Sequence, residues 1–165
     1  MDNNNKVLIV VGSQNDLPIM EGAAEILKKF EIGYEIHVSS AHRSIKRTVA
    51  IFEGAKDKGF KIIIAAAGMS AHLPGVAAAC TILPVIGVPI DSSSMHGLDS
   101  LLSIVQMPGG IPVATTAIGK SGAVNAALLA VSILSLNSDE LSGKLKNYRK
   151  ELEDKVIAAD NNIKI

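Results

Sequence analysis

The sequence predicts an α/β fold of three layers, in which a central parallel sheet lies between two layers of helices. Short runs of apolar, β-branched residues alternate with segments whose apolar residues recur at helical spacing. The strand-like runs are apolar on both faces, which is typical of parallel strands covered from both sides. No repeat or low-complexity linker divides the 165 residues, so we expect a single domain over residues 1–165.

The first half of the chain contains two strand–helix units. Its first run, KVLIVV, is nearly continuous in β-branched residues, and Pro18 after it suits the first turn of a helix. Gly33 follows the end of that helix. In the second helix, Val49, Phe52 and Ala55 are expected to face the core. The expected elements are a strand at 6–11, a helix from about 18 to 30, a strand at 34–38 and a helix near 44–58.

The second half continues the alternation. The segment 121–136 carries no charge and reads as a helix that is apolar nearly all round, which indicates a buried helix. The charged tail reads as an exposed helix with one apolar stripe formed by Leu141, Leu145, Tyr148, Leu152 and Val156. The expected elements are strands at 61–67, 84–88 and 112–116, a short alanine-rich helix after the loop at 68–74, and helices at 98–107, 121–136 and 138–159. The core should span about residues 6–136.

Charge is distributed unevenly along the chain. The 16 basic and 16 acidic residues balance, so nothing electrostatic indicates a nucleic-acid or anionic-membrane partner. Between residues 62 and 138 only Asp91, Asp99 and Lys120 are charged. Because charged side chains normally cover exposed surface, we expect other copies of the chain to cover this middle segment in a tight homo-oligomer.

Several classes of protein are excluded by simple features. Cys80 is the only cysteine, so no internal disulfide or cysteine metal cluster can form, and its alanine-rich surroundings favour a buried small hydrophobe. The first residues lack the pattern of a secretory signal. Glycine and proline residues interrupt the uncharged run 62–90, which argues against a membrane span. We therefore expect a cytoplasmic protein.

Polar groups follow the first strand directly. Residues 12–16 (GSQND) join this strand to a helix N-terminus, where free backbone N–H groups and the helix dipole attract anions. Ser13 could bind a phosphate, whereas Asp16 would repel one and suits a sugar hydroxyl. Both could instead simply cap the helix. The loop is neither a GxGxxG motif nor a P-loop, so dinucleotide and Walker-type nucleotide binding lose support.

Histidines follow the second and third strands. In residues 39–43 (SSAHR), His42 can take or give a proton near neutral pH and Arg43 can grip a phosphate or carboxylate in a two-pronged hydrogen bond. Ser70 and His72 are the polar side chains of the next loop. In open α/β folds ligands bind at the carboxyl ends of the strands, so these groups are candidates for one site. The alternatives are surface positions for His42 and Arg43 and a structural role for His72.

The remaining loops are less specific. Residues 92–100 (SSSMHGLDS) are rich in hydroxyl groups that could bind a ligand or only cap a helix, and Lys120 could meet a phosphate or reach solvent. No GxSxG elbow indicates a serine hydrolase, and no HExxH motif indicates a metal site. Proton transfer without a metal fits the residues better.

Taken together, six separated segments resemble the PurE family of de novo purine biosynthesis, in its N5-carboxyaminoimidazole ribonucleotide mutase class. The resemblance runs from about Lys6 to Leu136. The segments occur in the family's order: Gly12-Ser13-x-x-Asp16, Ser40-Ala41-His42-Arg43, Ala71-His72-Leu73-Pro74-Gly75, LPVIGVP at 83–89, DSLLSIVQMP at 99–108, and AxNAALLA at 123–130.

This resemblance implies an octamer of flavodoxin-like subunits that moves a carboxyl group from the exocyclic nitrogen to C4 of an imidazole ribonucleotide, with no metal or cofactor. It implies that His42 is the general acid and base. It also implies roles in substrate binding, for Ser13, Asp16 and Arg43 on the ribonucleotide and for Ser40, Ala41, Ser70, His72 and Leu73 in the lining of the site.

The sequence departs from the family pattern in places. Gly68-Met69-Ser70 replaces a Gly-Gly-Ala segment, Ser44-Ile45 replaces Thr-Pro, and Val76 replaces a methionine. The related carboxylase class, which uses carbon dioxide directly, usually carries lysine at the position of Arg43, so Arg43 and His72 favour the mutase. The alternatives are this carboxylase and a non-catalytic nucleotide-binding module.

Overall fold

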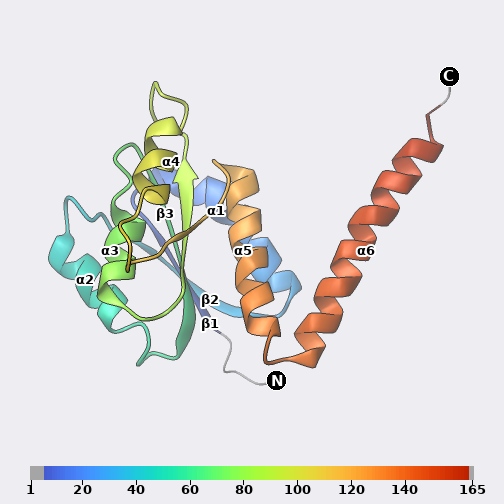
Figure 1. The fold of residues 1–165 in the computed structure, drawn as a ribbon, viewed down its shortest axis with the longest axis horizontal. Helices are drawn as coiled ribbons and strands as arrows, with labels where there is room; N and C mark the ends of the chain where they lie inside the picture. Colours follow the sequence, from blue (N-terminus) through green and yellow to red (C-terminus); the bar gives the residue numbers. More distant parts are fainter. Residues whose placement is uncertain (1–5, 164–165) are drawn as a thin grey trace. The chain divides into compact units, whose positions relative to one another are not determined.

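Five parallel strands form one sheet in the order β2-β1-β3-β4-β5 (Figure 1). The structure is a computed structural model and describes residues 6–163. The predicted α/β class and parallel sheet are therefore confirmed. The strands are β1 (Lys6–Val11), β2 (Gly33–Val38), β3 (Phe60–Gly68), β4 (Val85–Ile90) and β5 (Ala114–Thr115).

Helices cover both faces of the sheet. In Figure 1, α2 and α3 lie on one side, whereas α1 and the first turns of α5 lie on the other. This arrangement gives the three predicted layers. After a short 3-10 turn, η1 (Gln14–Asp16), the helices are α1 (Leu17–Lys29), α2 (Ile45–Glu53), α3 (Leu73–Cys80), α4 (Leu98–Val105), α5 (Lys120–Ser135) and α6 (Asp139–Asn161).

The two central strands form the middle of the core. Residues 7–11 of β1 and 62–66 of β3 are buried throughout, as expected for strands covered on both faces. On one face Phe52 of α2, Leu73 of α3 and Ile104 of α4 join the same buried cluster as the strands. Aromatic side chains are few, so alanine, valine and isoleucine allow helices and strands to approach closely.

The strands end together at their carboxyl edge. Val11 pairs with Val38 of β2 and with Ala66 of β3, and Gly68 pairs with Ile90 of β4. Beyond the ladder, the Gly12 N–H donates to the Ala66 carbonyl at 3.0 Å and the Ser39 N–H to the Val11 carbonyl at 2.9 Å. The loops after β1, β2, β3 and β4 therefore begin side by side.

Some predicted boundaries were wrong. The strand expected at 112–116 is only two residues long, because Pro112 offers no N–H to the ladder. The helix expected at 44–58 ends at Glu53, where Gly54 forms its C-cap and a turn leads to Gly59 at φ 83°. On this helix Thr48 is buried, whereas Val49, expected in the core, is only partly buried.

Two predictions of burial also differ from the structure of the single chain. Helix α5 buries Ala123, Ala126 and Ala127, but Leu129 is 37% exposed, so the helix is not buried all round. Helix α6, by contrast, was expected to be exposed, and in its apolar stripe only Leu141 is buried while Val156 is 70% exposed. Cys80, expected in the core, is only half-buried, although partial burial raises the pKa of its thiol.

The chain forms two compact units, one ending at Ala130 and one beginning at Val131. The second unit holds the end of α5 and the whole of α6. Ser138 caps α6, since its hydroxyl accepts a hydrogen bond from the Leu141 N–H at 3.3 Å. The single domain over residues 1–165 stays a prediction. No helix among the described residues has the length and apolarity to cross a membrane.

Gly87 provides a test of the close packing on β4. A Cβ atom here would press into the side chains of Ile104 and Val113, with Val113 Cγ1 at 2.9 Å. We expect Gly87→Ala to lower the free energy of unfolding by about 1–3 kcal/mol, measured by urea denaturation, because overpacking strains the core. Gly109→Ala is the control, since no atom lies within 4 Å of its added Cβ. Equal stability of both variants would contradict this packing.

Candidate active site

The four loops that follow β1, β2, β3 and β4 line one cavity of about 530 Å³. Its position at the carboxyl edge is the one expected for a ligand site in an open parallel sheet. Every residue to which the family resemblance gave a role in the site lies on its wall. These residues are Ser13, Asp16, Ser40, Ala41, His42, Arg43, Ser70, His72 and Leu73.

Ser13 and Asp16 cap the 3-10 turn after β1 reciprocally. The Ser13 N–H donates to Asp16 Oδ2 at 3.0 Å, and the Asn15 N–H donates to Ser13 Oγ at 3.3 Å. Capping was the alternative role for these residues, and the structure shows it together with their place on the cavity wall. Asp16 is only 5% exposed. Burial raises the pKa of its carboxyl, and the hydrogen bond from the Ser13 backbone only partly opposes this.

Ser40 organises the loop after β2. Its hydroxyl accepts hydrogen bonds from the Arg43 backbone N–H at 3.3 Å and from Arg43 Nε at 3.4 Å. These contacts draw the base of the guanidinium group back over the loop. The Arg43 side chain is nevertheless exposed and lines the cavity, so its terminal nitrogens can bind an anion there.

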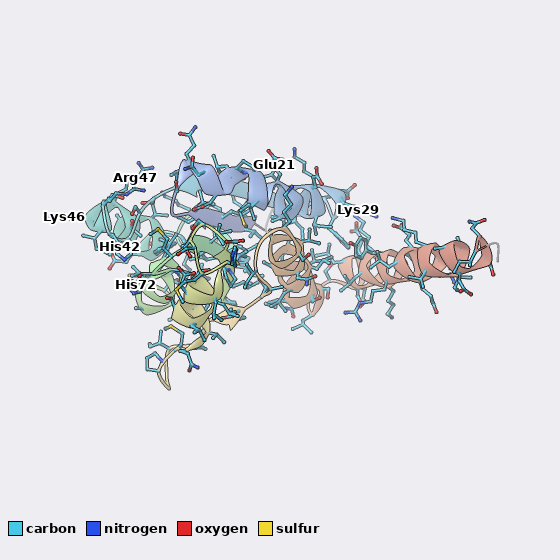
Figure 2. The ribbon with its side chains drawn as sticks, turned by 90° about the horizontal axis from the view of Figure 1, so that it is seen from above. Glu21, Lys29, His42, Lys46, Arg47 and His72 are labelled. Atoms are coloured by element: carbon cyan, nitrogen blue, oxygen red, sulfur yellow. The ribbon has the colours of Figure 1, made fainter. Side chains whose placement is uncertain are left out.

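The two histidines expected at the site are in direct contact. His42 Nε2 lies 2.7 Å from His72 Nδ1, and the rings meet edge to face at 86°. Figure 2 labels both side chains, which lie next to one another. If both rings are neutral, one nitrogen of the pair donates and the other accepts. The contact therefore couples the orientation of the His42 ring to that of His72, which the loop after β3 supplies.

The loop after β3 forms an apolar side of the cavity. Ala71 and Leu73 are buried beneath it, and α3 begins at Leu73 with Pro74 in its first turn. Met69 adopts a left-handed backbone at φ 55°, and its side chain is 60% exposed on the cavity wall. Apolar walls limit the number of water molecules that can approach a reacting group.

The sequence did not assign some residues of the wall to the site, although it left ligand binding open for the loop at 92–100. Ser92 lines the cavity, and a Cβ atom on Gly68 would collide with its hydroxyl. The position of Ser92, two residues after β4, could have indicated a place at the sheet edge. The sequence does not show which of the three consecutive serines 92–94 faces the cavity. Asn15 lines the cavity as well. Lys120, whose role the sequence left open, is not part of the wall.

Metal ligands do not gather at this site. Within residues 6–163, no cluster of three or more histidine, cysteine, aspartate or glutamate side chains has the arrangement to hold a metal ion. The groups on the wall suit a different task. They combine imidazole rings for proton transfer, a cation for an anionic ligand, and hydroxyl and carboxylate groups for a polar ligand.

Comparison with known proteins identifies the family. The family model of AIR carboxylase matches residues 6–155 of the chain. The chain belongs to the AIR carboxylase family. The resemblance to PurE seen in the sequence is thereby confirmed, and the six segments that carry it lie within the matched residues.

Relatives in this family resemble the chain over most of its length. An N5-carboxyaminoimidazole ribonucleotide mutase of Pyrococcus abyssi is 56% identical over 148 residues, which cover 90% of this chain and 84% of the relative. A mutase of the same name from Brucella melitensis is 52% identical over 156 residues, covering 94% of this chain and 96% of the relative.

A solved member of the family shares the fold. The crystal structure of Treponema denticola PurE superposes with a TM-score of 0.87 at 32% sequence identity, covering 98% of this chain and 99% of that one. The flavodoxin-like fold that the resemblance implied is thus confirmed for this member of the AIR carboxylase family.

Asp16 gives the site a defined pH dependence. Its raised pKa means that the folded chain holds this proton more tightly than the unfolded chain does. The protonated Asp16 carboxyl therefore stabilises the folded chain at low pH. This stabilisation is lost as the pH rises from about 3.8, the pKa in the unfolded chain, through the higher pKa in the folded chain. We expect Asp16→Asn to gain unfolding free energy relative to the native protein in urea denaturation as the pH rises above about 3.8, until the carboxyl of the folded native protein is ionised. A difference that stayed constant or reversed would show that burial does not disfavour the ionised carboxyl.

Proposed function

We propose that this protein is an N5-carboxyaminoimidazole ribonucleotide mutase, an isomerase of de novo purine biosynthesis. It converts N5-carboxyaminoimidazole ribonucleotide to 4-carboxy-5-aminoimidazole ribonucleotide. One observation carries the proposal: His42, Arg43, Ser13 and Asp16 line a single cavity in a chain that is 56% identical to a relative of that name.

The wall offers a complementary surface to a ribonucleotide. Arg43 and the Ser13 hydroxyl bind the phosphate, because a guanidinium group forms strong charge-assisted hydrogen bonds to phosphate oxygens. Asp16 accepts hydrogen bonds from the ribose hydroxyls. Ser40, Ala41, Ser70, His72 and Leu73 then surround the imidazole ring and its carboxyl group.

His42 handles both protons of the reaction. It first donates a proton to the exocyclic nitrogen as the bond from that nitrogen to the carboxyl carbon breaks, and this step releases carbon dioxide and the free amine. The nucleophilic ring carbon C4 then attacks the carbon dioxide. Neutral His42 finally takes the proton from C4, which restores the aromatic ring and the protonated histidine. One group thus acts as acid and then as base, with no net consumption of protons.

The cavity must keep the carbon dioxide near the ring between these steps. Ala41, Leu73 and Met69 make part of its wall apolar and offer the gas no nucleophile. No metal or cofactor has a part in the proposed steps.

The principal alternative is a carboxylase that takes carbon dioxide from solution. It is tested by supplying either the N-carboxylated nucleotide or aminoimidazole ribonucleotide with bicarbonate, and following the C4-carboxylated product. We expect the first substrate to support turnover at low bicarbonate, in keeping with arginine rather than lysine at position 43. Turnover of aminoimidazole ribonucleotide with bicarbonate, but not of the N-carboxylated nucleotide, would favour the carboxylase. Nucleotide binding without turnover of either would favour a non-catalytic module.

We further propose that the protein works in the cytoplasm as a homo-octamer. Leu98, Leu102 and Val105 of α4 are half exposed along one stripe, and Leu129 of α5 is also exposed. No charged residue lies between Asp99 and Lys120 in the sequence. An exposed apolar surface of this kind is typical of a protein–protein interface. Sedimentation at micromolar concentration should give an octamer, and a monomer would contradict the proposal.

His42→Asn provides the test of the proton transfer. Asparagine keeps a polar side chain on the loop but cannot exchange a proton, so we expect turnover to fall by about 10²–10⁴-fold while the nucleotide still binds. Binding is measured by isothermal titration calorimetry with the product, and turnover by absorbance. Turnover within a few-fold of the native protein would remove His42 from its role.

A further inference from the structure

Two buried hydroxyl groups lie at the base of the loop that carries His42. Ser39 directly follows β2 and is 3% exposed, and Thr48 lies in α2 and is fully buried. Ser39 Oγ and Thr48 Oγ1 are 2.8 Å apart. This hydrogen bond closes the loop at its base, because residues 40–47 lie between its partners. Neither residue lines the cavity.

The direction of this hydrogen bond follows from its neighbours. Thr48 Oγ1 donates its proton to the Ser44 carbonyl at 3.1 Å, so it can only accept from Ser39 Oγ. The Ser39 backbone N–H in turn donates to the Val11 carbonyl at 2.9 Å. A continuous set of bonds therefore joins the end of β1 to the start of α2 through Ser39 and Thr48.

A second set of bonds holds the loop together internally. The Ser44 hydroxyl donates to the Ser40 carbonyl at 3.0 Å and accepts from the Ser40 N–H at 3.2 Å. The Ser44 N–H also donates to the Ser40 carbonyl at 2.9 Å. These bonds fix the shape of the loop, but they do not attach it to the sheet. Ala41 and Phe52 pack against the core beside them, and the hydroxyl pair of Ser39 and Thr48 adds a directional bond between the end of β2 and α2.

Stability alone does not account for this pair. Two buried hydroxyl groups that bond each other contribute little net stability, and an apolar pair of the same shape can be as stable. The hydroxyl groups do add direction, since a hydrogen bond restricts both distance and angle. The orientation of the loop matters because the His42 side chain is exposed on it. The position of the His42 ring relative to the substrate therefore depends on the conformation of this loop.

We propose that Ser39 and Thr48 are positioning residues. They hold the loop of residues 40–47 in the conformation in which the His42 ring reaches the substrate. The proposal rests on the mutase function and deepens it, because it assigns part of the catalytic geometry to residues outside the cavity. A displacement of the acid by about 1 Å can cost about a hundredfold in rate.

The direct test is Thr48→Val, which keeps the shape of the side chain and removes the hydroxyl group. Ser39 Oγ then loses its partner, whereas the Ser44 carbonyl keeps the hydrogen bond from the Thr48 backbone N–H at 3.0 Å. The side-chain link between Ser39 and the first turn of α2 is thereby removed. We expect kcat to fall by about tenfold or more. Hydrogen exchange at the backbone amides of Arg43 and Ser44 should speed up by a similar factor. Thr48→Ser keeps the hydroxyl and should restore both measurements to within about twofold.

Two controls separate positioning from general loss of structure. Phe52→Leu lies one turn further along α2, in the core and away from the loop, and should lower stability without changing kcat or exchange at Arg43 and Ser44. Ser39→Ala removes the other partner of the bond, so it should reproduce the loss of Thr48→Val. The double variant should lose no more than either single variant, because one shared bond is removed.

The outcomes distinguish this inference from the proposed function. If the native protein transfers the carboxyl group but Thr48→Val and Ser39→Ala keep native kcat and amide exchange, the positioning role is wrong and the mutase function stands. If Phe52→Leu lowers kcat as much as Thr48→Val, the effect is general stability and the inference is also wrong. If the native protein itself does not turn over the carboxylated nucleotide, the proposed function fails first, and the exchange rates alone then decide whether the pair holds the loop.

Discussion

The parallel pairing of the strands is the constraint on which the rest of the structure depends. Because Val11, Val38, Ala66 and Ile90 lie at or near paired ends of neighbouring strands, the chain leaves the sheet four times at the same edge. The backbone pairing of the strands thereby brings together residues that are far apart in the sequence. The contact between His42 and His72, 30 residues apart, is a direct consequence of this geometry.

Small residues make this convergence possible and also shape the chemistry. Gly68 lets Ser92 approach the end of β3 closely, and Gly87 lets α4 lie against β4. The same preference for small apolar side chains makes part of the cavity wall apolar, at Ala41 and Leu73. Asp16 is the exception, since a carboxyl group is buried there at a cost in stability above its unfolded pKa. Such a cost is expected where binding rather than folding has selected a residue.

The sequence was sufficient for the parallel sheet, for the approximate positions of the strands along the chain and, with the family resemblance, for most of the cavity wall. Continuous β-branched runs mark buried parallel strands, and polar residues directly after them must lie at the sheet edge. Other features depend on details that a pattern does not carry. The bond between Ser39 and Thr48 was not foreseen, because a shift of one position on a short helix decides whether Thr48 or Val49 faces inward. The exposure of Leu129 on α5 in the single chain was also missed, since apolar composition alone does not say whether the same chain or another copy covers a given side chain.

The central claim of this account is that the carboxyl group moves between two atoms of one bound nucleotide inside the cavity at the sheet edge. It is tested most directly with a substrate whose N-carboxyl carbon is ¹³C, incubated in unlabelled bicarbonate, with the product examined by mass spectrometry after a single turnover. The account predicts that the C4 carboxylate keeps the ¹³C label. A product whose C4 carboxylate instead contained carbon from the solution would contradict it.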